Sequence, residues 1–110
     1  MTLATLDPRN RVRTRLADLG MSAIALAKLT NIPASRINLG LRELADWSPA
    51  DSHALLDTTL KLQEIRDAFS PLALDMSRPE ILRNLLDVME RHNVTPERIR
   101  ELVATIFEVK

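Results

Sequence analysis

The sequence predicts an all-α protein, because helix-start signals and apolar residues at helical spacing occur along its whole length. Asp7-Pro8, Ser48-Pro49 and Thr95-Pro96 each pair a capping residue with a proline suited to the first helical position. Ser77-Arg78-Pro79-Glu80 has the pattern of a capping box. Residues 22–40 have the spacing of two short helices joined by a tight turn. We therefore expect a bundle of helices.

The first predicted helix begins after Asp7 and ends near Gly20, with its apolar positions at Val12, Leu16 and Leu19. Its arginines alternate along the chain, so they divide into two pairs on different sides of the helix: Arg9 with Arg13, and Arg11 with Arg15. They cannot all contact one partner surface. We expect at least two to be solvated, with Arg9 or Arg13 near enough to the helix start to reach a phosphate.

Residues 22–40 then carry a short helix and a turn. Ile24, Ala27 and Leu29 supply apolar contacts on the short helix, and Ala27 is small enough for a second helix to cross closely. Asn31 follows, and asparagine tolerates the left-handed backbone conformation that such a turn needs. We expect the next residue, Ile32, to enter the core.

A second short helix follows the turn, and we expect Pro33 at its first position, where a missing N–H costs little. Ile37 anchors this helix to the core. Ser35, Arg36 and Asn38 then face outward and are the candidate DNA-facing groups.

Residues 22–46, above all the segment "ALAKLTNIPASRIN", resemble the lambda-repressor/Cro-like helix-turn-helix family, in the version found in small phage and prophage regulators. The resemblance implies a compact bundle of about five helices that binds operator DNA in the major groove as a homodimer. It also implies a phosphate-contacting basic residue after the second motif helix, at Arg42.

Three positions depart from the family pattern. Ala23 stands where many members have glutamine, and Ala34 and Leu39 stand where many have polar residues in the recognition helix. Base reading therefore depends on few groups. A bidentate Arg36 on guanine contributes roughly 1–3 kcal/mol of discrimination. Arg42 positions the protein on the phosphate backbone instead of reading sequence.

A longer helix is expected over residues 48–69, with an apolar stripe at Leu55, Leu56, Leu60, Leu62, Ile65 and Phe69. Trp47, just before it, is interpreted as a packing anchor, and stacking on DNA is the alternative. Residues 70–76 form a connection marked by Pro71.

Two further helices follow, joined at Asn93-Val94, and should fold back as a hairpin. Their stripes are Ile81, Leu82, Leu85, Leu86 and Met89, and then Ile99, Leu102, Val103, Ile106 and Phe107. The chain thus divides into a helix-turn-helix DNA-binding bundle, 1–69, and a C-terminal helical extension, 70–110. Whether the extension forms a dimer interface or packs internally stays open.

Composition excludes several classes of function. The 110 residues contain no cysteine, so disulfides and thiolate chemistry are absent. We find no phosphate-binding glycine loop, nucleophile elbow or His-Glu metal pair, and we expect no catalysis, metal or cofactor. His53 and His92 are interpreted as surface or capping residues. No segment has the length of a membrane span or the pattern of a signal peptide, so a soluble cytoplasmic protein is expected.

The net charge of zero conceals an asymmetry. Residues 1–47 hold seven basic and four acidic residues, whereas residues 48–110 hold eight basic and eleven acidic ones. A basic half that contains the motif fits binding to double-stranded DNA, although a scatter of surface charges explains so small a difference equally well.

Two functions follow from these patterns. The first is a sequence-specific transcriptional regulator, a repressor of phage type, that uses Ser35, Arg36, Asn38, Arg42 and Arg13. The second is a helix-turn-helix scaffold that acts as an inhibitor or adaptor and binds a protein partner through its C-terminal helices.

Overall fold

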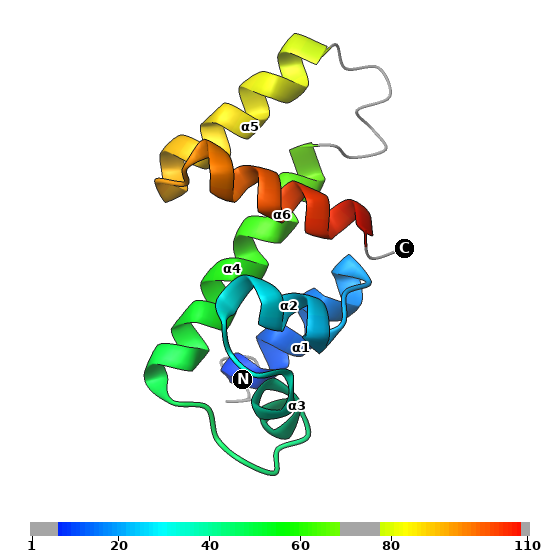
Figure 1. Cartoon of the computed structure of the whole chain (residues 1–110), viewed down its shortest axis with the longest axis vertical. Coiled ribbons are helices and arrows are strands. Elements are labelled where there is room, and N and C mark those ends of the chain that lie inside the picture. The colour runs from blue at the N-terminus through cyan, green and yellow to red at the C-terminus, as the bar shows by residue number, and fades with distance from the viewer. Residues whose placement is uncertain (1–6, 69–77, 109–110) are drawn as a thin grey trace, which may run out of the picture.

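The computed structural model describes residues 7–68 and 78–108, in which every regular element is a helix (Figure 1). The elements are α1 (Pro8–Leu19), α2 (Ala23–Thr30), α3 (Ala34–Leu41), α4 (Pro49–Ala68), α5 (Arg78–His92) and α6 (Pro96–Glu108). The all-α prediction is therefore confirmed for the described part of the chain.

The predicted start signals do cap helices. Asp7 Oδ1 accepts a hydrogen bond from the Arg9 backbone N–H at 3.0 Å, and Ser48 Oγ accepts one from Asp51 at 3.1 Å. Thr95 Oγ1 accepts one from Arg98 at 3.2 Å. Each bond satisfies a backbone donor that the first helical turn leaves without a partner. Ser77 of the fourth signal lies outside the described residues.

Four of the described helices end with a residue in the left-handed conformation, and the ends at Gly20, Glu43 and Asn93 share one hydrogen-bond pattern. Gly20, Glu43 and Asn93 have φ values of 65°, 60° and 52°. In each case the next residue donates its N–H to a carbonyl five positions back, such as Met21 to Leu16 O at 2.9 Å. This is the Schellman arrangement, which lets the chain reverse direction at once. The expected stop at Gly20 is confirmed.

Helix α4 is the centre of the molecule, because α1, α2, α5 and α6 all pack against it (Figure 1). Helix α3 packs on α1 and α2. Arginines reinforce these contacts from the periphery. Arg15 of α1 donates to the Leu56 carbonyl of α4 at 2.7 Å, and Arg66 of α4 reaches the Asp18 carboxylate of α1 at 2.6 Å.

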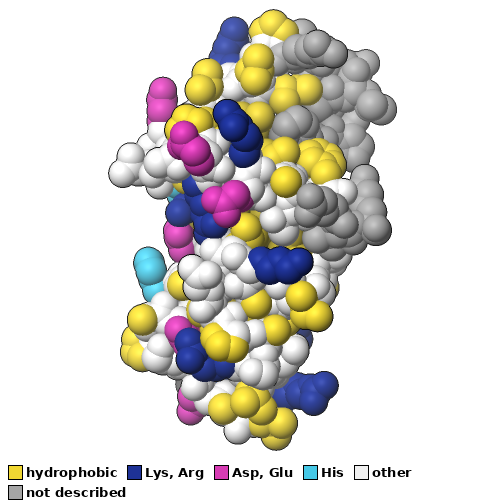
Figure 2. Space-filling view, viewed as in Figure 1, with side chains coloured by type: hydrophobic (Ala, Val, Ile, Leu, Met, Phe, Trp, Pro, Cys, Tyr) yellow, Lys and Arg dark blue, Asp and Glu magenta, His cyan; other side chains and the backbone are white. Residues whose placement is uncertain are grey.

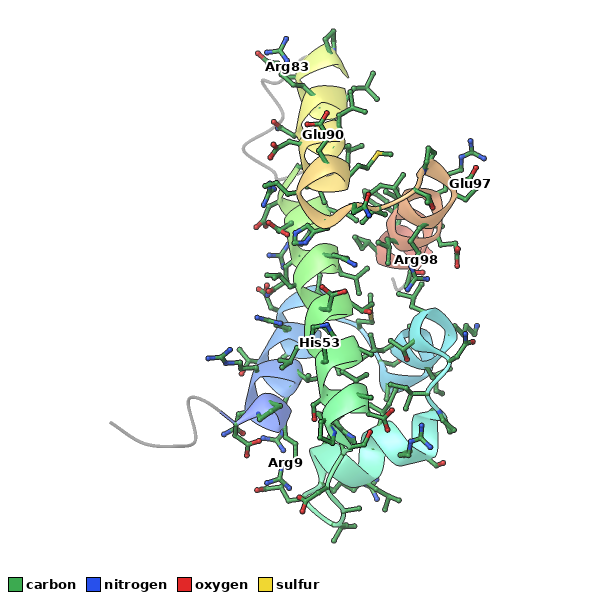
Figure 3. The ribbon with its side chains drawn as sticks, turned by 90° about the vertical axis from the view of Figure 1, so that its left-hand side faces the viewer. Arg9, His53, Arg83, Glu90, Glu97 and Arg98 are labelled. Atoms are coloured by element: carbon green, nitrogen blue, oxygen red, sulfur yellow. The ribbon has the colours of Figure 1, made fainter. Side chains whose placement is uncertain are left out.

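One continuous core joins the N-terminal helices to the C-terminal ones. Leu26, Ile37 and Leu55 are fully buried in it, and so is Leu102 from α6. Arg98 of α6 also lies between α6 and α2 (Figure 3), where it donates to the Leu29 carbonyl at 2.7 Å. The C-terminal helices thus contribute to the core that holds α2 and α3. The division at residue 69/70 stays a prediction.

The predicted stripe of α4 is correct at Leu55, Leu62 and Ile65 but wrong at Leu60, which is 38% exposed. Thr59 is buried in its place. The helix can bury this threonine because its hydroxyl donates to the Leu55 carbonyl at 2.7 Å, so no polar group is left without a partner. Phe69 lies outside the described residues.

The C-terminal helices differ from the predicted hairpin. The chain reverses at Asn93 as expected, but α5 and α6 diverge from this joint and each packs on α4 (Figure 1). Val88 is the buried residue of α5, while Leu82 and Leu86 of the predicted stripe are 59% and 55% exposed. The reason is that α4 covers only one side of α5. In α6, Leu102 is buried and Phe107 is 47% exposed.

Candidate nucleic-acid interface

The turn between α2 and α3 is built as the sequence predicts. Asn31 adopts the left-handed conformation and donates its N–H to the Ala27 carbonyl at 2.9 Å. Thr30 Oγ1 accepts the N–H of Ile32 at 3.3 Å, which ties the turn to the helix end. Ile32 is 5% exposed and enters the core. These contacts set the direction in which α3 leaves the turn.

Helix α3 begins one residue later than predicted. Pro33 caps the helix from outside, with its carbonyl accepting the N–H of Arg36 at 3.0 Å and of Ile37 at 3.1 Å. Ile37 is fully buried, as expected, and Gly40 is buried on the same face. The opposite face therefore turns to solvent.

Four of the five candidate DNA-contacting residues lie on that outward side. Ser35, Arg36 and Asn38 of α3 are exposed, and so is Arg42 at its C-terminal end. In α2 the prediction for Ile24 is wrong, because this side chain is 63% exposed and the core position is taken by Leu26.

Trp47 is a packing residue. Its side chain is buried against α3, and the indole N–H donates to the Arg36 carbonyl at 3.1 Å. Gly40 makes this approach possible, since a Cβ atom there would overlap three atoms of the indole ring. The contact fixes the C-terminal half of α3 against the loop that leads into α4, and it leaves the ring little surface for stacking on a base.

Arg36 has an intramolecular partner that sequence reasoning missed. Its Nε lies 2.9 Å from Asp51 Oδ2, and its Nη2 lies 3.5 Å from Asp51 Oδ1. The sequence alone shows Asp51 only as an acidic residue three positions after Ser48, because no local pattern indicates that this turn of α4 lies beside α3. This pair holds the Nε edge of the guanidinium against the first turn of α4.

Arg13 of α1 contacts the C-terminal end of α3. Its guanidinium donates to the Leu41 carbonyl at the C-terminal end of α3 and to the Asn10 side chain. A cation at this end of a helix is favourable because the terminal carbonyls have no helical donors. The structure thereby brings Arg13 to the same end of α3 as Arg42. Arg9, the other candidate for phosphate contact, pairs with Asp7 at 3.4 Å and with Asp46 at 3.3 Å.

Leu39 and Leu44 form an apolar pair at the edge of this surface. They are 43% and 69% exposed. The Leu44 N–H donates to the Leu39 carbonyl at 2.9 Å, which makes them the two residues whose side chains commonly touch in a Schellman motif. The Leu39 carbonyl thus takes part in closing the C-terminal end of α3, while its side chain stays partly exposed.

Charges of both signs surround the candidate surface. In Figure 2 the Lys and Arg side chains on the visible face are separated by acidic and apolar ones and do not form one continuous patch. Lys28 of α2 is a further exposed cation that sequence reasoning did not select. It could have been found as the one basic residue in the last turn of the first motif helix.

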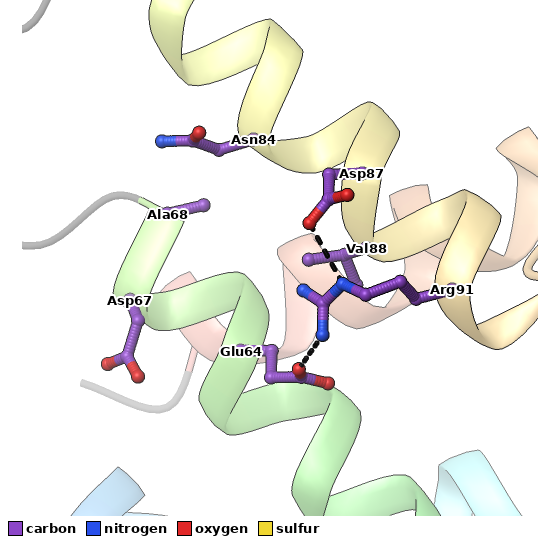
Figure 4. Close-up of a pocket in the computed structure, with 7 residues that line it drawn as sticks. All are labelled: Glu64, Asp67, Ala68, Asn84, Asp87, Val88 and Arg91. Carbon is purple, nitrogen blue, oxygen red and sulfur yellow. Dashed lines mark hydrogen bonds and ion pairs between the residues drawn. The ribbon is translucent and has the colours of Figure 1, made fainter.

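A second polar cluster lies between α4 and α5, far from α3. It lines a pocket formed by Glu64, Asp67, Ala68, Asn84, Asp87, Val88 and Arg91 (Figure 4). Arg91 contacts one oxygen of Glu64 and also Asp87, at 2.8 Å, while His92 contacts the other oxygen of Glu64. His92 thus links α5 to α4 through Glu64, whereas His53 is exposed.

The ionisation of Glu64 in this cluster makes the stability of the fold depend on pH. Burial alone raises the pKa of Glu64, but hydrogen bonds from Arg91 and His92 outweigh it and hold the pKa below its usual 4.5. A carboxyl with a lowered pKa in the folded state stabilises the fold above its unfolded pKa, and this contribution disappears as the pH falls through the folded pKa.

We therefore expect Glu64→Gln to lower the free energy of unfolding by about 1–2 kcal/mol at pH 7. The difference from the unmodified protein should shrink as the pH falls below 4.5. Urea unfolding at several pH values measures both effects. Glu97→Gln, at an exposed position in α6, is the matched control. A difference that persists undiminished at pH 3 would contradict the role given to the carboxylate.

Within the described residues, no three His, Asp or Glu side chains lie close enough together to hold a metal ion. No helix in the described ranges has the length and apolarity needed to cross a membrane. Comparisons with protein-family models, with curated proteins and with solved structures find no match to this chain.

Proposed function

We propose that this protein binds double-stranded DNA by laying α3 in the major groove. The observation that carries the proposal is the division of α3 into two faces. Ile37 and Gly40 bury one face against the core, and the other presents Ser35, Asn38 and Arg42 to solvent. A short helix held rigidly with polar side chains outward is what groove binding needs.

The candidate residues divide into two roles. Ser35, Asn38 and a released Arg36 can reach base edges, whereas Arg42 at the end of α3 is suited to a phosphate. Arg13 acts on α3 through the Leu41 carbonyl, so its contribution is to position the helix. With the family resemblance, these roles make a phage-type transcriptional repressor that binds as a homodimer the function we propose.

Substitutions separate these roles. We expect Arg36→Ala to relax sequence preference and to cost roughly 1–3 kcal/mol on the preferred site. Arg42→Ala should weaken binding to every sequence alike and lower the salt dependence by about one counterion.

Asp51→Asn should strengthen binding, since it releases Arg36 and removes a negative charge from the surface. Fluorescence anisotropy on preferred and random duplexes measures all three, and equal losses on both duplexes for Arg36→Ala would contradict its reading role.

A protein-binding scaffold is the second candidate. It is favoured by the Arg36–Asp51 ion pair, which makes the α3 surface less basic than a groove-binding surface usually is. The exposed side chains of Leu39 and Leu44 also make this surface more apolar.

Selection of random duplex DNA by the purified protein at moderate salt decides between the two candidates. DNA binding predicts enrichment of a sequence and steep weakening as salt rises, because phosphate contacts release counterions. If the folded protein enriches no sequence and binding to bulk DNA is absent at low salt, the DNA proposal is wrong and the scaffold is favoured.

A further inference from the structure

The outward face of α5 combines exposed apolar residues with a basic residue before Leu86 and an acidic residue after it along the helix. Leu82 and Leu86 are 59% and 55% exposed, and they lie four positions apart on one side of the helix. Arg83 and Glu90 are exposed next to them (Figure 3). Neither side chain has a hydrogen bond or an ion pair within the described ranges, unlike Asp87 and Arg91, which pair with each other on the side toward α4.

We propose that this face of α5 binds α5 of a second copy of the chain in an antiparallel arrangement, with Leu86 at the two-fold axis. In such a pair, a residue three or four positions before Leu86 faces one three or four positions after it in the partner. Arg83 then meets Glu90 of the other copy, and symmetry forms this ion pair twice. Leu82 meets Met89, which is half-buried, so the centre of the contact is apolar.

Charge complementarity selects a second copy as the occupant. A foreign partner would need its own arrangement of charges, whereas here Arg83 and Glu90 of one helix supply both halves of a matched pair. In a parallel pair, Arg83 of one copy and Glu90 of the other lie seven positions apart along the helices, about 10 Å, so the ion pair does not form. Specificity for the antiparallel pairing thus arises from the same two residues.

The contact is small, and its size predicts its strength. Specific interfaces bury about 1,200–2,000 Å² in total, and a single pair of helices lies at or below this range. We therefore expect a monomer and a dimer that exchange with protein concentration. Helix α5 lies at the opposite end of the molecule from α3 (Figure 1), so α3 of each copy stays free. Use of this dimer at an operator rests on the proposed function, whereas the contact itself does not.

Charge reversal tests the pairing. Sedimentation velocity over a concentration series should show the unmodified chain associating. Arg83→Glu alone, or Glu90→Arg alone, should weaken association about tenfold or more, because each places like charges together twice. An equimolar mixture of the two variants should restore it, and so should the double variant. Leu86→Glu should abolish association, and Ile24→Glu, exposed on α2, is the matched control. Helicity by circular dichroism verifies folding.

Two results would overturn the proposal: an unmodified chain that stays monomeric across the series, or single charge variants that fail to recover on mixing. Neither result would contradict the proposal that the protein binds DNA. If both proposals hold, Leu86→Glu still selects a half-site from random duplexes but no longer selects a two-fold symmetric site. If only the dimer is correct, the chain associates and enriches no sequence.

Discussion

Gly40→Ala is expected to lower the free energy of unfolding by roughly 2–4 kcal/mol, an unusually large cost for one methyl group in a helix. The new Cβ atom would overlap the Trp47 indole, so the ring must move away from α3. That movement also breaks the hydrogen bond from the indole N–H to the Arg36 carbonyl, worth about 1 kcal/mol. Thermal unfolding followed by circular dichroism measures the loss.

A second glycine and a second background identify the cause. Gly20→Ala should cost about 1–2 kcal/mol for a different reason, since space is free around Gly20 but its φ is 65°. In a Trp47→Ala background the overlap at Gly40 is gone. There Gly40→Ala should be neutral or stabilising by up to about 1 kcal/mol, because alanine is the better helix former. A cost that stays the same without the indole would show that the ring is not its origin.

Leu102→Ala is expected to destabilise the whole described fold by about 2–5 kcal/mol. Leu102 belongs to α6 but is fully buried in the core that also contains Leu26 and Leu55. Removing its side chain leaves a cavity beside α4, the helix on which α1, α2, α5 and α6 pack. Ile24→Ala, which removes the same number of carbon atoms at a position 63% exposed, is the control and should change stability by no more than about 0.5 kcal/mol.

Leu102→Ala also tests whether the two predicted parts of the chain, 1–69 and 70–110, unfold separately. Trp47 is the one tryptophan of the chain, so its fluorescence reports on the N-terminal helices, whereas circular dichroism reports on all of them. One shared core predicts coincident transitions by both probes, and a shift of both in Leu102→Ala. If fluorescence holds while helicity falls, the C-terminal helices are an independent unit.

Predictions from sequence are most accurate where neighbouring residues decide the structure. Asp7, Ser48 and Thr95 cap the helices that their spacing predicts, because a cap needs only a side-chain oxygen and a backbone N–H two or three positions away. Asn31 adopts the left-handed turn for a similarly local reason. The outward placement of Ser35 and Asn38 follows from the burial of Ile37 at helical spacing.

Predictions fail where contacts join distant parts of the chain. Leu60 and Ile24 were expected in the core on apolar character alone, yet which side of a helix is buried depends on where α4 and α2 meet their neighbours. The pairing of Arg36 with Asp51 spans fifteen positions, and that of His92 with Glu64 spans twenty-eight. No local pattern signals such pairs.

The sequence by itself determined the all-α class, the helix starts and the left-handed turn before α3, because caps and turns depend on a few neighbouring residues. The tertiary structure alone decided that α4 is the central helix and that α5 and α6 diverge on it. It also decided that Arg36 is held by a carboxylate while Leu82 and Leu86 stay exposed. The physical reason is that burial and ion pairing depend on distances in space, which the packing of whole helices sets.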